Sequence, residues 1–343
     1  MVKTLDKQTI GILGAGAAGT AYGQLLALSG HTVLAWDTDA EIRDDINKRH
    51  EQRKRFPGIM LSPNLVAVAT AEEVLAKCKV VIIGIPAHLQ TEVAAVVSPY
   101  LTKKHILVHA SAGVRPSDGA LLTEVWAEAV PHPLTQAVIA GPNFAIEMMQ
   151  GLFTALVVAA EKMSTAETVG KLFTVKYIRP YFSDDMVGVQ VAGAMKNVLS
   201  IAAGMVDGMG DAANVGTNAR AALLCRGLVE MTRLATAMGG KAETMMGLAG
   251  MGDVLLHATS TLSRNYRFGV LVGRGISVEE AAERVAYVEG IHTARMVAYL
   301  AASNGLDLAI VSAVDGILNG DVTPERAYEI LLTRPPHAEF EGV

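Results

Sequence analysis

The sequence TIGILGAGAAG at residues 9–19 decides the fold class of the first half of this chain. The apolar residues 9–13 have the composition of a buried strand, and residues 20–28 have the apolar spacing of a helix. Three glycines separate the two segments. A strand, a glycine turn and a helix in this order are typical of a fold that binds dinucleotides.

Each glycine of the turn has a separate task in such a fold. Gly14 permits the tight bend, Gly16 lets a pyrophosphate approach the backbone, and Gly19 lets the helix pack closely on the strand. The first amide groups of the helix would bind the phosphates, those of Ala17 and Ala18 among them. The alternative is a tight turn without a ligand, which the flanking strand and helix disfavour.

A second strand is predicted at residues 32–36, and Asp37 follows it directly. An acid at this point accepts the ribose hydroxyls of the adenosine and repels a 2′-phosphate. Thr38 adds no positive charge, so the sequence predicts NAD in preference to NADP. Asp37 can also be interpreted as a solvated acid, because Asp39 and Glu41 are close to it in sequence.

Further apolar segments predict a doubly wound α/β sheet of the Rossmann type. A helix is expected at residues 41–49, and strands at residues 66–68, 80–85, 106–109, 137–140, 155–159 and 177–181. Pro86 follows one of these strands at the edge where such sheets bind cofactors. It either lines that crevice or only ends the strand.

The character of the sequence changes after Asp185. Segments rich in Gly, Ala and Met carry apolar residues at helical spacing, and no further strand is predicted. We therefore expect residues 1–188 to form the NAD-binding Rossmann-type domain and residues 189–343 to form an all-helical domain for substrate binding and catalysis. The boundary is expected at the start of a long helix that contains Lys196.

Length, charge and composition limit the function classes. A chain of 343 residues accommodates two domains with separate cores, and its net charge of -5 provides no basic face for nucleic acid. We find neither a signal peptide nor an uninterrupted apolar run of about 18 residues, the length that spans a membrane. We expect a soluble, cytoplasmic protein whose partner is a small molecule. The apolar helical half would suit a homodimer.

The cysteines do not indicate a disulfide or a metal centre. Cys78 and Cys225 are the only two in the chain, and they are far apart in sequence. Both occur in apolar surroundings, so we expect two core thiols and no bound metal.

A lysine and an amide stand together in GAMKN at residues 193–197. The neighbours of Lys196 are small or apolar, so it is either a buried functional lysine or one whose ammonium reaches water from a helix. A buried lysine acts as a general acid or base where its surroundings bring its pKa toward neutrality. Asp253 has similarly small neighbours, and pairing with Lys196 would satisfy both buried charges.

A third polar segment, SRNYRFG at residues 263–269, concentrates hydrogen-bond donors. Arg264 can bind a phosphate through two N–H groups, and Asn265 adds an amide. The alternative is a helix cap with a surface arginine.

These segments together resemble the NAD-dependent glycerol-3-phosphate dehydrogenase family along nearly the whole chain. The similar segments, besides the glycine turn, lie at residues 56–58, 141–147, 193–197, 218–222, 226–228, 247–253, 263–269 and 288–290. The resemblance implies the interconversion of dihydroxyacetone phosphate and sn-glycerol 3-phosphate with NAD as cofactor. It also implies a place in glycerol-3-phosphate metabolism and phospholipid biosynthesis.

The resemblance also implies a role for individual residues. Lys196 would be the general acid/base, Asn197 its neighbour in the pocket, and Asp253 the support of the lysine. Arg264 and Asn265 would bind the substrate phosphate and the cofactor. The remaining implied contacts are Gly141, Asn143 and His257 for the substrate, and Pro86, Ala145 and Glu289 for the cofactor.

The chain departs from the family's pattern at two positions. Ala112, in the loop after the strand at residues 106–109, stands where the family usually has lysine, and His257 stands where it usually has threonine. The imidazole would compensate for the lost charge, or the pocket is rebuilt for another substrate. His109 would either reach into the pocket or have a structural role.

Three functions are consistent with these observations. The first is the dehydrogenase reaction above, with Lys196 handling the proton. The second is a diverged dehydrogenase of the same family, acting on another small phosphate, phosphonate or carbonyl compound. The third is an NAD-binding regulator with weak or no catalysis.

Overall fold

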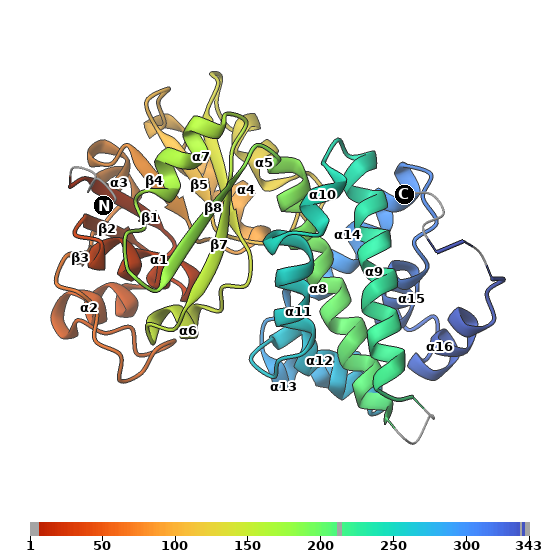
Figure 1. The fold of residues 1–343 in the computed structure, drawn as a ribbon. Helices are drawn as coiled ribbons and strands as arrows, with labels where there is room; N and C mark the ends of the chain where they lie inside the picture. The colour runs from red at the N-terminus through yellow and green to blue at the C-terminus, as the bar shows by residue number, and fades with distance from the viewer. Residues whose placement is uncertain (1–6, 211–214, 337, 340–343) are drawn as a thin grey trace. The chain divides into compact units, whose positions relative to one another are not determined.

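The computed structural model describes residues 7–210, 215–336 and 338–339. Its contacts divide the chain into two compact units (Figure 1). The N-terminal unit comprises Met1–Arg115 and Ala120–Met186, and the C-terminal unit comprises Pro116–Gly119 and Val187–Val343. A short segment of the first half therefore packs with the C-terminal unit.

The N-terminal unit is built on one eight-stranded sheet with the order β3-β2-β1-β4-β5-β6-β7-β8. The strands are β1 (Thr9–Leu13), β2 (Thr32–Trp36), β3 (Leu65–Ala67), β4 (Val80–Ile83), β5 (Ile106–His109), β6 (Thr135–Ala140), β7 (Thr154–Ala159) and β8 (Ile178–Ser183). The expected doubly wound sheet is confirmed. One pairing differs from a fully parallel sheet, because β7 runs antiparallel to β6 while β8 is parallel to β7.

Helices cover both faces of this sheet. They are α1 (Ala17–Leu28), α2 (Ala40–Arg49), α3 (Ala71–Lys77), α4 (Gln90–Val97), α5 (Leu122–Glu128), α6 (Ala145–Met149) and α7 (Met163–Gly170). Strand β4 shows why two layers are needed, because all of its side chains are buried. Val80 and Ile82 belong to the core on one face, whereas Val81 and Ile83 belong to the core on the other.

The described residues of the C-terminal unit form helices and the loops between them, and none of them forms a strand. Its helices are α8 (Met186–Met209), α9 (Thr217–Ala237), α10 (Ala242–Met245), α11 (Asp253–Ala258), α12 (Arg264–Gly273), α13 (Val278–Val285), α14 (Glu289–Ser303), α15 (Ala309–Leu318) and α16 (Pro324–Leu332). The long helix α8 contains Lys196 and begins at Met186.

Helix α8 is also the one described helix that is long and apolar enough to cross a membrane. However, 89% of its most apolar window is buried inside the protein. Composition alone cannot separate a membrane span from a core helix, and the burial of α8 identifies it as the core helix of this unit.

Close contact between α8 and α12 positions the polar residues of the C-terminal unit. A Cβ added to Gly204 would lie 2.2 Å from the main-chain oxygen of Tyr266, and one added to Gly269 would lie 2.1 Å from that of Ile201. Only glycine lets two helix backbones approach so closely. This contact brings the start of α12 beside the middle of α8.

The two cysteines differ in burial. Cys78 is buried, and its burial raises the pKa of the thiol to about 11. Cys225 is exposed, so the expectation of two core thiols is wrong for this residue. It lies between Leu224 and Gly227 on α9, but on the side of the helix that faces solvent, because those two neighbours supply the buried face.

Candidate functional site

The glycine turn at the end of β1 has the geometry that its sequence predicts. Gly14 has φ +90°, in the left-handed region that favours glycine. A Cβ on Gly19 would lie 1.9 Å from the main-chain oxygen of Gly14, so helix α1 packs directly on the turn. Gly84 makes a further close contact, because its Cβ would lie 2.7 Å from the same oxygen.

Gly16 is the open position of the turn. A Cβ added there would meet nothing within 4 Å, and no side chain caps the first amide groups of α1. Uncapped amides at a helix N-terminus bind anions. The space and the amide groups together fit the pyrophosphate of a dinucleotide.

A carboxylate and a guanidinium lie at the end of β2, the first from Asp37 and the second from Arg43 of α2. Asp37 accepts a hydrogen bond at 3.0 Å from the main-chain N–H of Asp39. Arg43 of α2 donates to the main-chain oxygens of Asp37, at 2.5 Å, and of Thr38, at 3.2 Å. Arg43 is six residues from Asp37 in sequence, and the first turn of α2 brings it back to the strand end, so the neighbours of Asp37 in the sequence do not reveal it.

The other predicted residues of the N-terminal unit are placed as follows. Pro86 is exposed and precedes the short helix Ala87–Leu89. Asn143 donates from Nδ2 to the Tyr22 hydroxyl at 2.9 Å, which ties the loop after β6 to α1. Gly141 in that loop has φ +119°, and Ala145 begins α6. Their contacts with substrate or cofactor remain predictions.

His109 has a structural role. Its side chain is fully buried at the end of β5, its Nε2 lies 2.8 Å from Gln136 Oε1, and its ring packs edge-on against Trp126. Burial lowers the pKa of His109 to about 4, so the ring is neutral at physiological pH. Ala112 lies in the loop that follows β5.

Lys196 lies in a buried cluster with an acid and an imidazole. Its Nζ is 3.0 Å from Asp253 Oδ2 and 3.2 Å from His257 Nε2. His257 Nδ1 in turn lies 2.8 Å from Asp253 Oδ1. The side chains of Lys196 and Asp253 are only 10% and 3% exposed, so the ammonium does not extend along the helix surface to water.

The ionisation of Asp253 follows from this cluster. Burial alone would raise the pKa of the carboxyl group, but the charge of Lys196 and the contacts of the carboxylate with Lys196 and His257 outweigh burial and hold the pKa below its ordinary value. Asp253 is therefore a carboxylate at neutral pH. It begins α11 directly after a single π-helical turn, Leu248–Gly252, an irregularity that occurs often at functional sites.

A chain of amides lies beside this cluster. The main-chain N–H of Gly290 donates to Asn265 Oδ1 at 3.0 Å, and Asn265 Nδ2 donates to Asn197 Oδ1 at 2.9 Å. These two bonds fix the orientation of both side-chain amides. Asn197 Nδ2 is then directed elsewhere, and it is buried without a hydrogen-bond partner among the described residues. A buried donor of this kind is available to a ligand.

A second group of polar residues surrounds the start of α14. Tyr287 donates its hydroxyl proton to Glu289 at 2.5 Å, and the Arg264 guanidinium lies 5.7 Å from the centre of the Tyr287 ring. Burial raises the pKa of Glu289, while Tyr287, Arg264 and Lys196 lower it less strongly. Tyr287 was missed in sequence analysis, although it directly precedes the segment at residues 288–290.

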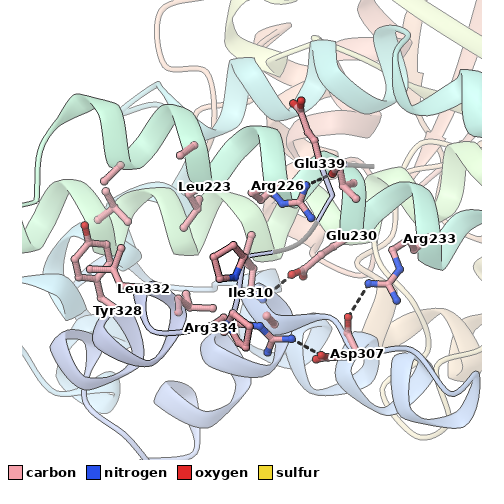
Figure 2. Close-up of a pocket in the computed structure, with 18 residues that line it drawn as sticks. Leu223, Arg226, Glu230, Arg233, Asp307, Ile310, Tyr328, Leu332, Arg334 and Glu339 are labelled. Atoms are coloured by element: carbon pink, nitrogen blue, oxygen red, sulfur yellow. Dashed lines mark hydrogen bonds and ion pairs between the residues drawn. The ribbon is translucent and has the colours of Figure 1, made fainter. Parts of the chain in front are cut away.

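A cavity of about 800 Å³ also lies in the C-terminal unit, between α9, the start of α15 and the segment after α16 (Figure 2). Its lining contains none of the predicted site residues. The buried Glu230 projects toward it and accepts the main-chain N–H groups of Ile310, at 2.8 Å, and Val311, at 3.2 Å. This acid therefore caps helix α15.

Among the described residues, no group of three or more His, Cys, Asp or Glu side chains could hold a metal ion.

The chain matches family models over most of its length. The N-terminal model of NAD-dependent glycerol-3-phosphate dehydrogenase matches residues 9–166, and the C-terminal model of the same family matches residues 185–329. Each model covers the bulk of one structural unit.

Similar proteins of known name agree with these models. A protein of Stenotrophomonas maltophilia named glycerol-3-phosphate dehydrogenase (NAD(P)+) is 40% identical over 99% of this chain and 98% of its own length. A protein of the same name from Xanthomonas campestris is 39% identical over 97% of both chains.

Solved structures extend the similarity to the fold. A crystal structure of glycerol-3-phosphate dehydrogenase from Coxiella burnetii has 33% identity and a TM-score of 0.89, covering 96% of this chain and 99% of its own. The two family models, the curated relatives and this shared fold agree. The chain belongs to the NAD-dependent glycerol-3-phosphate dehydrogenase family.

Proposed function

We propose that this protein interconverts dihydroxyacetone phosphate and sn-glycerol 3-phosphate with NAD as cofactor. The observation that carries the proposal is the buried ion pair of Lys196 and Asp253 beside the unpartnered Asn197 amide. A lysine held in this way can move a proton, which dehydrogenation of an alcohol requires in addition to hydride transfer. The names of the curated relatives support the same reaction.

The cofactor, when bound, supplies hydride to the central carbon of the substrate or accepts hydride from it. The N-terminal unit would hold it through the open backbone at Gly16 and the first amides of α1. Asp37 would accept the ribose hydroxyls. Arg43 lies beside Asp37 and would offer a positive charge to a 2′-phosphate, so we expect a preference for NAD without complete exclusion of NADP.

Lys196 would act as the general acid in reduction and the general base in oxidation. Its ammonium would give a proton to the oxygen on the central carbon, and its amine would take that proton back in the reverse direction. Asp253 holds the Nζ of Lys196 in place through the ion pair at 3.0 Å. Because the pair is buried, this electrostatic interaction is stronger than a surface ion pair would be.

Polar groups of the same unit would bind the substrate. The free N–H bonds of Asn197 Nδ2 are suited to a substrate oxygen. Arg264 is exposed at the first turn of α12, where a guanidinium can bind a phosphate with two hydrogen bonds. Asn265 would act mainly by holding Asn197, since both ends of its amide are bonded within the protein.

The experiment that tests the proposal follows NADH absorbance with purified protein and several substrates. We expect turnover with dihydroxyacetone phosphate, and little with dihydroxyacetone or phosphonate analogues. Faster turnover of an analogue would favour the diverged dehydrogenase, an alternative that Ala112 and His257 keep open. Binding of NADH without turnover of any candidate would favour the NAD-binding regulator.

We further propose that the protein acts in the cytoplasm, where its product would supply phospholipid biosynthesis, and that it forms a homodimer through its helical unit. The apolar composition of that unit supports the dimer. Light scattering from the purified protein measures the molecular mass directly, and the mass of one chain would contradict the dimer.

A further inference from the structure

The orientation of the His257 ring can be derived from its neighbours. His257 lies four residues after Asp253 on α11, so its ring folds back over the acid. Its Nδ1 lies 2.8 Å from Asp253 Oδ1 and 3.1 Å from the main-chain oxygen of the same residue. A main-chain oxygen only accepts hydrogen bonds, and so does the carboxylate oxygen of the ionised Asp253. Nδ1 therefore carries the proton.

The opposite ring nitrogen faces the lysine. His257 Nε2 lies 3.2 Å from Lys196 Nζ. An ammonium donates hydrogen bonds and accepts none, so the lone pair of Nε2 must accept one from Lys196. Asp253 Oδ2, at 3.0 Å, takes a second N–H of the same ammonium. With two of its three N–H bonds directed in this way, the lysine has a single direction left for the third.

The contacts on both sides of the ring fit an imidazole that donates at Nδ1 and accepts at Nε2. Lys196 and Asp253 form one pair of opposite charges. The charges of Arg264 on α12 and of Lys196 also lower the pKa of Glu289 on α14, against the larger effect of burial. A protonated His257 would turn its Nε2 from an acceptor into a donor that points at the lysine ammonium. The 3.2 Å contact between Nε2 and Nζ therefore fits a ring whose Nε2 accepts.

We propose that His257 is a positioning residue for Lys196, which holds the ammonium in one orientation by accepting a hydrogen bond at Nε2. This inference rests on the proposed function, in which Lys196 transfers the proton. His257 acts through Lys196 and Asp253, so its main effect is on the rate of turnover. It differs from the substrate contact that the family resemblance implies for this position.

The tautomer can be tested without any substrate. Nitrogen NMR of the full-length protein labelled in its histidines should show His257 protonated at Nδ1 and unprotonated at Nε2, with the signals assigned by their loss in His257→Gln. Lys196→Met removes the donor and should shift the Nε2 signal. A ring protonated at Nε2, or an Nε2 signal that Lys196→Met leaves unchanged, overturns the proposal.

Kinetics with dihydroxyacetone phosphate and NADH then test the positioning role. His257→Phe keeps a planar ring without the acceptor, and we expect kcat to fall about 100-fold, the size of effect that a small misplacement of a catalytic group produces. KM should change little. His257→Gln retains an acceptor and should recover most of the lost rate. The exposed Leu255 on the same helix supplies the control, since Leu255→Gln should leave kcat unchanged.

The outcomes separate this proposal from the proposed function. A larger effect of His257→Phe on KM than on kcat indicates a substrate contact and overturns positioning, as does a Gln variant no faster than the Phe variant. Thermal unfolding of each variant shows whether it is folded, and the NMR result decides alone if His257→Phe is not. Full activity of Lys196→Ala would instead overturn the proposed function, whatever the tautomer of His257.

Discussion

The two units offer their ligands different kinds of chemistry. The N-terminal unit would bind its ligand through main-chain groups. Gly14, Gly16 and Gly19 make this possible because they have no side chains to block the turn. The C-terminal unit presents buried side chains, with Lys196 and Asp253 in contact across 57 positions of the sequence. A backbone site depends on space and on a helix N-terminus, whereas a side-chain site depends on charges that must be paired when they are removed from water.

Removing the lysine amine should produce the largest effect. We expect Lys196→Ala to lower kcat at least about 100-fold, the smaller end of what a general acid contributes. The affinity for NADH should stay nearly unchanged, because the cofactor's phosphates are assigned to the other unit. Stopped-flow kinetics and NADH fluorescence titration measure the two quantities separately. If Lys196→Ala lowered kcat and NADH affinity by the same factor, the lysine would not act separately from the cofactor site.

The buried acid Glu230 is expected to affect the stability of the C-terminal unit and not its catalytic activity. Burial raises the pKa of this acid to about 7 from its ordinary 4.5. An acid whose pKa is higher in the folded state favours folding below its unfolded pKa, and that contribution is lost as pH rises through the folded pKa. The loss from pH 4.5 to 7 amounts to about 3 kcal/mol at 1.36 kcal/mol per unit.

Glu230→Gln removes this titration. Urea unfolding of both proteins across the same pH range should therefore show a wild-type free energy of unfolding that falls more steeply with pH than that of the variant. The kcat of Glu230→Gln at neutral pH should match the wild type, because the residue caps α15 and lies outside the lysine cluster. Parallel pH dependences would show that Glu230 does not titrate in this range.

A pair of glycine substitutions tests the backbone site. Gly16→Ala places its methyl group in open space, so thermal stability should not change. The methyl group would occupy the approach to the pyrophosphate, and we expect NADH to bind about tenfold more weakly, which corresponds to about 1.4 kcal/mol. Gly19→Ala is the matched contrast, because its methyl group would meet the turn itself and lower the unfolding temperature. Unaltered NADH affinity in Gly16→Ala would argue against a pyrophosphate at this position.

The smallest expected effects concern the choice between NAD and NADP. Asp37→Asn removes a charge that repels a 2′-phosphate, and Arg43→Ala removes a nearby positive charge. We expect the ratio of kcat/KM for NADPH over NADH to rise a few-fold in the first variant and to fall in the second. The cofactor preference would not depend on these residues if the ratio stayed constant in both.

The elements of the N-terminal unit could be predicted because their signals are local. Strand β2 and helix α1 follow from runs of apolar residues and from the glycines between them. The antiparallel pairing of β6 and β7 could not be predicted in this way. Both strands are short apolar runs, and their relative direction depends on the path of the chain between them.

The candidate site could be predicted only in part. The small neighbours of Lys196 and Asp253 suggested a buried pair but left open a lysine whose ammonium reaches water. No local pattern shows which nitrogen of His257 faces the lysine. Arg43 was missed because a turn of α2 brings it to Asp37, and Tyr287 was missed because it contacts Arg264, which is distant in sequence. Cys225 was misjudged because an apolar neighbourhood along the sequence does not tell which side of a helix faces solvent.

The glycine contact between α8 and α12 has a mechanical consequence. The backbones of α8 and α12 are in contact, so the two helices cannot move closer together, and the Asn265–Asn197 hydrogen bond forms between helices already held at this distance. The contact between these two helices forms a rigid support for the side chains that α8 and α12 carry. We therefore expect a single substitution of a polar side chain on α8 or α12 to change the chemistry at that position without moving the helix that carries it.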